Sequence, residues 1–293
     1  MPEGDTIYRT ARALGRALTG KPITRFQSEY ALIAQADDEH PFVGQTIQQI
    51  EARGKWLLIH FSSNQASSEA GAHGSKPLER VLATHMLMSG SWHIYRPGER
   101  WQEPRSNARI VVETADFVAV AFRVPVARIY TAESLAREKT IPQPATDVLK
   151  EDFDIVAAVE RIKRYPDEEI AHVLLRQSVL AGVGNVFKSE ICFLTGTSPF
   201  QKVVTFSESK LKEIASTAQR LMAANVLEDS GNQIVTYSGR KRRTTRSANP
   251  GESLWVYGRK NEPCRRCQTL IQRCLQGPNA RSTYWCPTCQ PLF

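Results

Sequence analysis

Four cysteines near the C-terminus have the residue types and the spacing of a metal site. They form two Cys-x-x-Cys pairs, Cys264 with Cys267 and Cys286 with Cys289, which are separated by residues 268–285. Each pair can bend into a tight knuckle, and four thiolates around one tetrahedral ion make a structural zinc site. Disulfides are not expected in a reducing cytosol, and a redox motif normally has a single such pair. The spacing therefore predicts one structural Zn²⁺ ion.

The N-terminal stretch "MPEGD" offers a second chemistry. Methionine before a small residue is normally removed, and this would give Pro2 a free secondary amine. An α-amino group has a reference pKa of about 7.7–8.0, so part of it is neutral and nucleophilic near neutral pH. Such an amine can form a Schiff base with an aldehyde-like carbon, and the neighbouring Glu3 can move protons. The alternative is that Met-Pro is a chance beginning and that the early acid only suits the helix dipole.

A glycine-containing turn in the second half of the chain offers a phosphate site. The stretch "QSVLAGVGNVFKSE", residues 177–190, contains Gly182, Gly184 and Asn185 between two helix-like segments. Glycines let backbone amides approach a ligand closely, and a turn that leads into a helix can hold a phosphate. Asn185 can add its side-chain amide. The alternative is that the turn is plain helix-turn-helix architecture.

The charge of the chain favours a polyanionic partner. Lys and Arg number 38 against 30 Asp and Glu, a formal net charge of +8. The run "GRKRRTTRSANPGE" at 239–252 is expected to be an exposed loop that follows a nucleic-acid backbone, or else only a solvated loop. Neither a membrane-spanning run nor the pattern of a signal peptide is found in the sequence. A cytoplasmic or nucleoid-associated protein is therefore expected.

The elements that would position these residues fall into two groups. Apolar spacing predicts an amphipathic helix at 5–19, and β-like runs follow at 56–61, 80–87, 108–114 and 117–122. The Ser- and Gly-rich insertion 62–79 is expected to form a loop. Helical spacing then dominates, at 152–165, 167–180 and 207–227. The remaining cysteines, Cys192 and Cys274, are expected to be free thiols.

The combination resembles a known family. The "PEGD" start, the lysine in "ARGKWLLIHF", the "QSVLAGVGNVFKSE" turn and the terminal Cys-x-x-Cys ribbon occur in the order found in the formamidopyrimidine-DNA glycosylase and endonuclease VIII family of base-excision repair enzymes. The resemblance covers the whole chain. It implies an α+β multidomain fold: an N-terminal helix plus β-sandwich domain (1–134), a linker (135–150), a helical helix-two-turn-helix domain (151–257) and a zinc ribbon (258–293).

The resemblance also implies roles for individual residues. Pro2 would be the nucleophile that attacks C1′ of the damaged nucleotide, and Glu3 the general acid and base that assists opening of the sugar. Lys55 would be the strand-borne lysine that contacts phosphate and is needed for base removal. Asn185 and Arg281 would bind the phosphates that flank the lesion.

An apolar side chain on a hairpin is expected to act as a wedge and to fill the gap left by the flipped nucleotide. The resemblance places it at Leu87 and Met88, in "THMLMSGSW"; the alternative for Met88 is an ordinary core strand residue. "PEG" rather than "PEL" at the start, and "FRVPVARIY" where the 8-oxoguanine-directed branch has Asp-Pro-Arg-Arg-Phe, favour an endonuclease VIII-like enzyme acting on oxidised pyrimidines. That branch usually has a polar residue, a leucine and an aromatic residue as its wedge, so Leu87, Met88 and Ser89 depart from it.

The predicted function is that of a bifunctional DNA glycosylase and AP lyase. It would act as a monomer on damaged double-stranded DNA, through a Schiff base on Pro2 and successive β and δ eliminations. Two alternatives remain open at this point. A non-catalytic DNA- or RNA-binding zinc-ribbon protein needs the basic surface but no free proline. A zinc-dependent nuclease would need an open metal site, which four cysteines do not provide.

Overall fold

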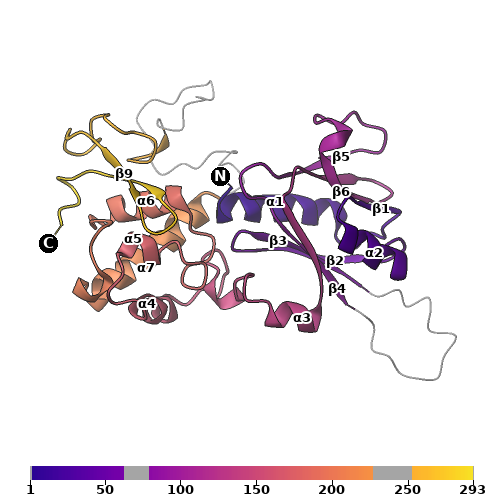
Figure 1. The fold of residues 1–293 in the computed structure, drawn as a ribbon, viewed down its shortest axis with the longest axis horizontal. Helices are drawn as coiled ribbons and strands as arrows, with labels where there is room; N and C mark the ends of the chain where they lie inside the picture. Colours follow the sequence, from indigo (N-terminus) through magenta and orange to yellow (C-terminus); the bar gives the residue numbers. More distant parts are fainter. Residues whose placement is uncertain (1, 63–78, 227–252, 293) are drawn as a thin grey trace. The chain divides into compact units, whose positions relative to one another are not determined.

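The computed structural model describes residues 2–62, 79–226 and 253–292. The chain divides into two compact units: unit 1 contains Pro2 and Thr6–Ile141, and unit 2 contains Glu3–Asp5 and the chain from Pro142 onward. Figure 1 shows both units along the chain. The basic run 239–252 and most of the insertion 62–79 lie outside the described residues.

Unit 1 is built on α1 and two antiparallel sheets. Its helices are α1 (Gly4–Leu18), α2 (Ala31–Glu39) and α3 (Ala132–Arg137). Its described strands are β1 (Arg25–Ser28), β2 (Ile47–Arg53), β3 (Trp56–Phe61), β4 (Arg80–His85), β5 (Ser91–Tyr95), β6 (Ala108–Glu113), β7 (Val118–Phe122) and β8 (Val126–Thr131). They form one sheet in the order β1-β6-β7-β5 and one in the order β2-β3-β4-β8. All neighbouring strands in both sheets are antiparallel.

A single core joins the two sheets and α1, and this makes unit 1 the predicted sandwich. The helix contributes its predicted apolar stripe, and β3 and β7 contribute alternate residues from the two sheets. The other faces of these strands are also covered, because Trp56 and Leu58 of β3 pack with Leu135 and Val120 of β7 packs beneath Tyr95. Successive side chains of a strand point to opposite faces, so runs such as "WLLIHF" need apolar partners on both sides.

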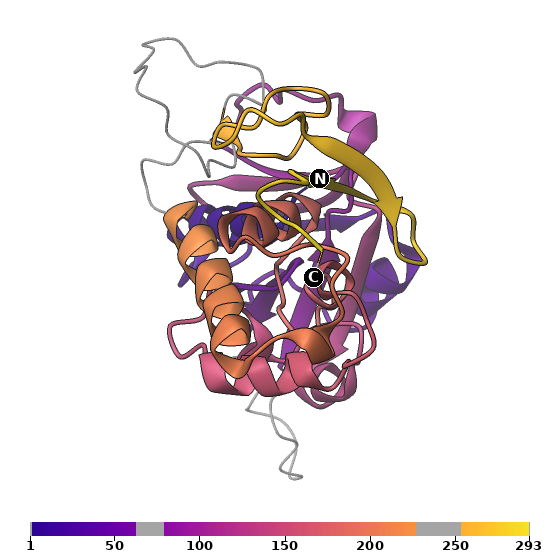
Figure 2. The same ribbon diagram turned by 90° about the vertical axis from the view of Figure 1, so that its left-hand side faces the viewer.

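Unit 2 is helical and ends in a small hairpin. Its elements are α4 (Ile155–Lys163), α5 (Ile170–Val173), α6 (Asn185–Leu194), α7 (Glu208–Ala224), β9 (Gln272–Gln276) and β10 (Arg281–Trp285). Buried side chains of the four helices share one core. The antiparallel β9 and β10 are the yellow arrows in Figure 2. A separate cluster packs Phe193 of α6 against Val256, Ile271 and two of the cysteines.

The segment 167–180 is not the single helix that its apolar spacing predicts. α5 covers only Ile170–Val173, and most N–H groups that follow donate to carbonyls three residues back, as in tight turns. The side chain of Gln177 accepts from the N–H of Gly182 at 2.9 Å and donates to the carbonyl of Val183 at 3.0 Å. These bonds tie the end of the segment to the glycine turn that follows it.

Candidate active site and metal centre

Glu3 is anchored at the beginning of α6. Its carboxylate is fully buried and accepts hydrogen bonds from the backbone N–H groups of Gly184 at 3.0 Å, Val186 at 2.8 Å and Phe187 at 3.3 Å. The first N–H groups of a helix have no partner within it, and they favour a negative charge. These three amides therefore hold Glu3. They are not available to a phosphate, contrary to the expectation from the glycine turn.

Three glycines make this close approach possible. The N–H of Gly4 donates to the carbonyl of Gly182 at 2.9 Å. A Cβ on Gly4 would lie 2.6 Å from the Cα of Gly182, and one on Gly184 would lie 2.3 Å from the Cδ of Glu3. Gly182 also has a φ of +98°, in the region that favours glycine. The "PEGD" start and the "GVGN" turn therefore pack backbone against backbone.

Asn185 is the first residue of α6 and follows directly on the Glu3 anchor. Its side-chain oxygen is buried and has no hydrogen-bond partner within the described part of the chain. A buried polar atom without a partner is costly, and such atoms often await a ligand or water. The unpartnered oxygen is an acceptor and needs a donor such as water, whereas only the side-chain NH2 of Asn185 could donate to an anion at this end of α6.

Pro2 and Lys55 belong to unit 1. Pro2 is half-buried and lies two residues before the start of α1, one peptide bond from Glu3. Lys55 was expected in a strand, but it lies with Gly54 in the two-residue turn that joins β2 to β3, where Gly54 has a φ of +61°. A lysine in such a turn presents its ammonium at the end of the sheet.

His85 is a site residue that the sequence did not reveal. It ends β4, packs edge-on against Trp56 with ring centroids 5.1 Å apart, and its Nδ1 accepts from the N–H of Leu87 at 3.1 Å. Burial lowers the pKa of His85, and the positive charge of Lys55 lowers it further. The neutral ring with its proton on Nε2 is therefore favoured. The structure thus brings Lys55, His85 and Leu87 into one neighbourhood.

The predicted wedge residues lie on an exposed loop. Leu87 is 43% exposed with a φ of +46°, and Met88 is 71% exposed, so Met88 is not a core strand residue. The loop was expected in a hairpin, but it connects β4 of one sheet to β5 of the other. It closes tightly, since the N–H of Gly90 donates to the carbonyl of Met86 at 2.8 Å. Two large apolar side chains are therefore presented to solvent from a fixed loop.

A buried lysine ties α6 to the hairpin that carries Arg281. Lys188 is 1% exposed, and its Nζ donates to the carbonyl of Ser282 at 3.0 Å and to Oγ1 of Thr283 at 2.7 Å. Burial lowers the pKa of Lys188 to about 8. Arg281 itself is exposed at the start of β10. Lys188 was also missed, although a lysine within the apolar run "NVFKSEICF" was a possible signal.

Glu190 provides a second tie between α6 and the C-terminal segment. This buried carboxylate accepts from the backbone N–H groups of Trp255 at 2.9 Å, Val256 at 3.0 Å and Tyr257 at 2.9 Å. Burial raises the pKa of Tyr257, and the charge of Glu3 raises it further. Tyr257 therefore lies in the electrostatic surroundings of Glu3. Neither contact could be predicted from the sequence.

The four predicted cysteines come together. Their sulfur atoms all lie within 4.8 Å of one another. Cys264 and Cys289 are 3.9 Å apart and Cys267 and Cys286 are 3.4 Å apart, close to the edge of about 3.8 Å expected for sulfurs about 2.3 Å from one tetrahedral ion. A backbone N–H donates to Cys264 at 3.4 Å and another to Cys286 at 3.5 Å, which suits thiolates. The donor set can hold a metal ion. Cys192 and Cys274 lie outside the cluster and are free thiols.

No helix in the described ranges is both long and apolar enough to cross a membrane.

Two family models match the chain: the formamidopyrimidine-DNA glycosylase N-terminal domain over residues 1–125, and the H2TH domain of the same enzymes over 142–236.

Relatives match over nearly the whole chain. A Streptomyces coelicolor protein named "Probable endonuclease 8 2" is 35% identical and covers 99% of this chain and 94% of its own. The DNA-(apurinic or apyrimidinic site) lyase Nei2 of Mycolicibacterium smegmatis is 35% identical, with 99% of both chains covered. Endonuclease 8 of Escherichia coli is 28% identical, with 99% of this chain and 100% of its own covered.

Solved structures share the fold. The Lactococcus lactis formamidopyrimidine-DNA glycosylase bound to DNA with an abasic site superposes with a TM-score of 0.75 at 20% identity, over 99% of both chains. A MutM complex with DNA containing carbocyclic 8-oxoguanine has a TM-score of 0.74 at 19% identity, over 99% of this chain and 100% of its own. By fold, by family model and by full-length relatives, this chain belongs to the formamidopyrimidine-DNA glycosylase and endonuclease 8 family of DNA repair enzymes.

Proposed function

We propose that this protein is a bifunctional DNA glycosylase and AP lyase that removes oxidised bases, chiefly pyrimidines, from damaged double-stranded DNA. One observation carries the proposal: Glu3 is buried against the beginning of α6, and this fixes the residue next to Pro2. A nucleophile must be held within a fraction of an ångström of its target to be effective. An anchored neighbour supplies that restraint to the N-terminal amine.

The chemistry follows from a secondary amine. The lone pair of the Pro2 nitrogen attacks C1′ of the damaged nucleotide, and the bond to the base breaks, so that the base leaves with the bonding electrons and gains a proton. Opening of the sugar gives an iminium ion. Loss of a C2′ proton then expels the 3′ phosphate, and a second elimination expels the 5′ phosphate. Water hydrolyses the iminium and frees Pro2.

Glu3 serves this sequence as a carboxylate. Three N–H donors stabilise its charged form, so it begins the reaction unprotonated. The same bonds lower its affinity for a proton, so a proton that it accepts is readily passed on to the sugar oxygen as the ring opens. Its buried position excludes water from the proton transfer, and this strengthens the electrostatic interactions within the site.

The remaining residues hold the DNA. Lys55, Asn185 and Arg281 bind phosphates close to the lesion, and Leu87 and Met88 fill the space that the flipped nucleotide leaves. Flipping costs a few kcal/mol, and damaged bases reduce that cost. His85 accepts from Leu87 through Nδ1, so its Nε2–H is a further donor for a phosphate oxygen.

Zn²⁺ is the ion that best fits the four-cysteine cluster. Four thiolates leave no coordination position for a substrate, so the ion would stabilise the ribbon and take no part in the reaction. We assign the protein to the endonuclease 8 branch because its full-length relatives carry that name. It would act as a monomer on DNA inside the cell.

Borohydride trapping tests the proposal directly. Duplexes with an abasic site, a dihydrouracil or an 8-oxoguanine are incubated with the wild type and with Pro2→Gly, and the adducts are mapped by mass spectrometry. An adduct on the N-terminal residue, formed faster with dihydrouracil than with 8-oxoguanine and strongly reduced in the variant, is expected. Tight binding without any adduct, on a chain with its methionine removed, would mean that the scaffold binds DNA without this chemistry.

A further inference from the structure

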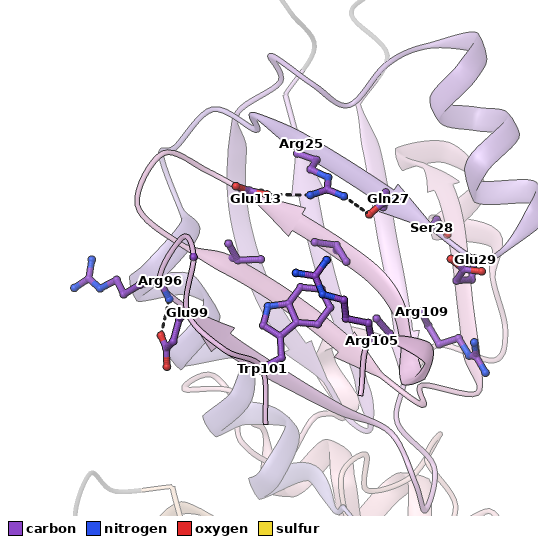
Figure 3. Close-up of a pocket in the computed structure, with 14 residues that line it drawn as sticks. Arg25, Gln27, Ser28, Glu29, Arg96, Glu99, Trp101, Arg105, Arg109 and Glu113 are labelled. Carbon is purple, nitrogen blue, oxygen red and sulfur yellow. Dashed lines mark hydrogen bonds and ion pairs between the residues drawn. The ribbon is translucent and has the colours of Figure 1, made fainter. Parts of the chain in front are cut away.

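Unit 1 contains a pocket of about 350 Å³ on its β1-β6-β7-β5 sheet. This volume lies in the range of roughly 300–1,000 Å³ that small-molecule sites occupy. The floor is formed by Val111, Val118 and Ala108, and Trp101 stands beside it. Figure 3 shows the pocket and the polar side chains around it. None of these residues is among those to which the proposed reaction assigns a role.

Trp101 is fixed in place by other aromatic rings. Its indole stacks on Tyr95 at a centroid distance of 6.2 Å and meets Phe122 edge-on at 5.7 Å. The guanidinium of Arg105 lies over the indole, 5.0 Å from the ring centroid, as Figure 3 shows. A flat aromatic ring with a cation beside it is a surface on which a nucleobase stacks well.

The charges around the pocket leave a small positive excess. Four arginines and three glutamates line it, which leaves one positive charge. Arg25 is 3.9 Å from Glu113 and donates to Gln27 at 2.8 Å. Arg105 and Arg109 have no ion-pair partner among the residues that the structure describes. The guanidinium of Arg105 is therefore available for an anion beside the indole, and Arg109, which points away from Trp101 in Figure 3, adds positive charge at the rim of the pocket.

We infer that this pocket binds a nucleotide, with the base against Trp101 and the phosphate on Arg105, where Arg109 adds to the positive charge, and that the nucleotide is an unpaired one of a DNA single strand. A nucleotide within a strand carries a single negative charge, and this matches the excess of one positive charge around the pocket. The carboxylates can accept hydrogen bonds from the N–H groups of bases, the N3–H of thymine among them. An acidic peptide with several carboxylates would instead meet Glu29, Glu99 and Glu113.

Within unit 1, hydrogen bonds connect the pocket to the wedge loop, the segment 86–90 between β4 and β5. The N–H of Arg123 donates to the carbonyl of Asn107 at 2.8 Å. Asn107 lies two residues after Arg105. The hydroxyl of Ser89, in the wedge loop, donates to the carbonyl of Arg123 at 3.3 Å. The side chain of Arg123 also pairs with Glu103. The inference rests on the proposed function in that the strand comes from the DNA being repaired.

The experiment uses the full-length protein and a short oligothymidine with one 5-iododeoxyuridine. Irradiation is expected to cross-link the modified base to the peptide that contains Trp101. The double variant Arg105→Gln/Arg109→Gln, which keeps the indole, should bind the oligonucleotide and thymidine monophosphate about tenfold more weakly and lose the cross-link, as should Trp101→Ala. Arg137→Ala removes an exposed arginine of the same unit and should stay within about twofold of the wild type.

The outcomes distinguish between the possible ligands of the pocket. They also distinguish failure of this inference from failure of the proposed function. Binding of the oligonucleotide at least as tight as that of the mononucleotide supports a strand as the source, whereas a site that takes only the mononucleotide overturns that part. Trp101-dependent binding of an Asp- and Phe-rich peptide, without any nucleotide binding, overturns the inference. Cleavage of a duplex with a preformed abasic site should be unchanged in the double variant. If the wild type also fails to cleave this duplex, the result contradicts the proposed function and not the inference about the pocket.

Discussion

The carboxylate of Glu3 and the backbone of Gly184 lie so close that no side chain fits between them. Oε2 of Glu3 accepts from the N–H of Gly184 at 3.0 Å, although the two residues are 181 positions apart in the chain. A Cβ at residue 184 would lie 2.3 Å from Cδ and 2.4 Å from Oε1 of Glu3. The position of the carboxylate beside Pro2 is thus determined by a glycine from a distant part of the sequence.

Gly184→Ala is therefore expected to displace Glu3. The overpacked contact should lower the free energy of unfolding by about 1–3 kcal/mol, and borohydride trapping should slow by about tenfold or more because the amine loses its anchored neighbour. Gly15→Ala is the matched control, since its Cβ would meet only Oγ1 of Thr19 at 3.8 Å. In the middle of α1 it should stabilise the protein by up to about 1 kcal/mol. Wild-type trapping by Gly184→Ala would show that the anchor is not needed.

Lys188→Met should change the pH dependence of stability. The pKa of Lys188 is lowered from 10.5 to about 8 in the folded protein, so the unfolded chain binds the extra proton between these values. The free energy of unfolding should consequently rise with pH across this window, by up to about 3 kcal/mol, and the variant should lack that rise. Urea unfolding at several pH values measures it.

DNA affinity gives a second test of the role assigned to Lys188. The variant loses the hydrogen bonds to Ser282 and Thr283 that hold the hairpin carrying Arg281, so affinity for an abasic duplex should fall by about tenfold. Lys202→Met, which changes an exposed lysine of the same unit, should alter neither the pH dependence of the free energy of unfolding nor the affinity for the abasic duplex. Equal pH profiles for the wild type and Lys188→Met would contradict the assigned role.

His85 is expected to make the wedge loop sensitive to acid. Its pKa lies below 6.5, so the neutral ring stabilises the folded state, fully above about pH 6.5 and less as the pH falls through the folded value. Protonation removes the acceptor at Nδ1, so the amide signal of Leu87 should shift with the same midpoint as the ring signals of His85. His85→Asn, which keeps an acceptor that does not titrate, should hold the loop at acid pH. An amide signal of Leu87 that is independent of pH would refute the coupling.

Metal content distinguishes the clustered cysteines from the others. Cys289→Ser should hold less than one equivalent of zinc, and its ribbon should unfold, because a ligand of the cluster is lost. Cys274→Ser lies outside the cluster and should keep one equivalent. Elemental analysis measures the metal, and binding to an abasic duplex measures the consequence. Full affinity in metal-free protein would mean that the ribbon does not need the ion.

Much of the chemistry could be predicted from local sequence. The spacing of Cys264, Cys267, Cys286 and Cys289 is a short-range feature, because each pair forms its own knuckle, and the structure confirms that the four meet. The stripe of α1 was likewise predictable, since a period of 3.6 residues depends on neighbouring positions alone. The family followed from four such local motifs in order.

Tertiary contacts decided the rest. The helix predicted at 167–180 is limited to Ile170–Val173, and Gln177 bonds to the turn after the segment, a contact that local spacing does not report. Lys188 with Thr283 and Glu3 with Gly184 are pairs 95 and 181 positions apart. Their geometry depends on which groups burial brings together and on which of them must then be hydrogen-bonded. Residue types and spacing thus determined which chemistry this protein can perform, and only the packing of distant segments decided where each group is held.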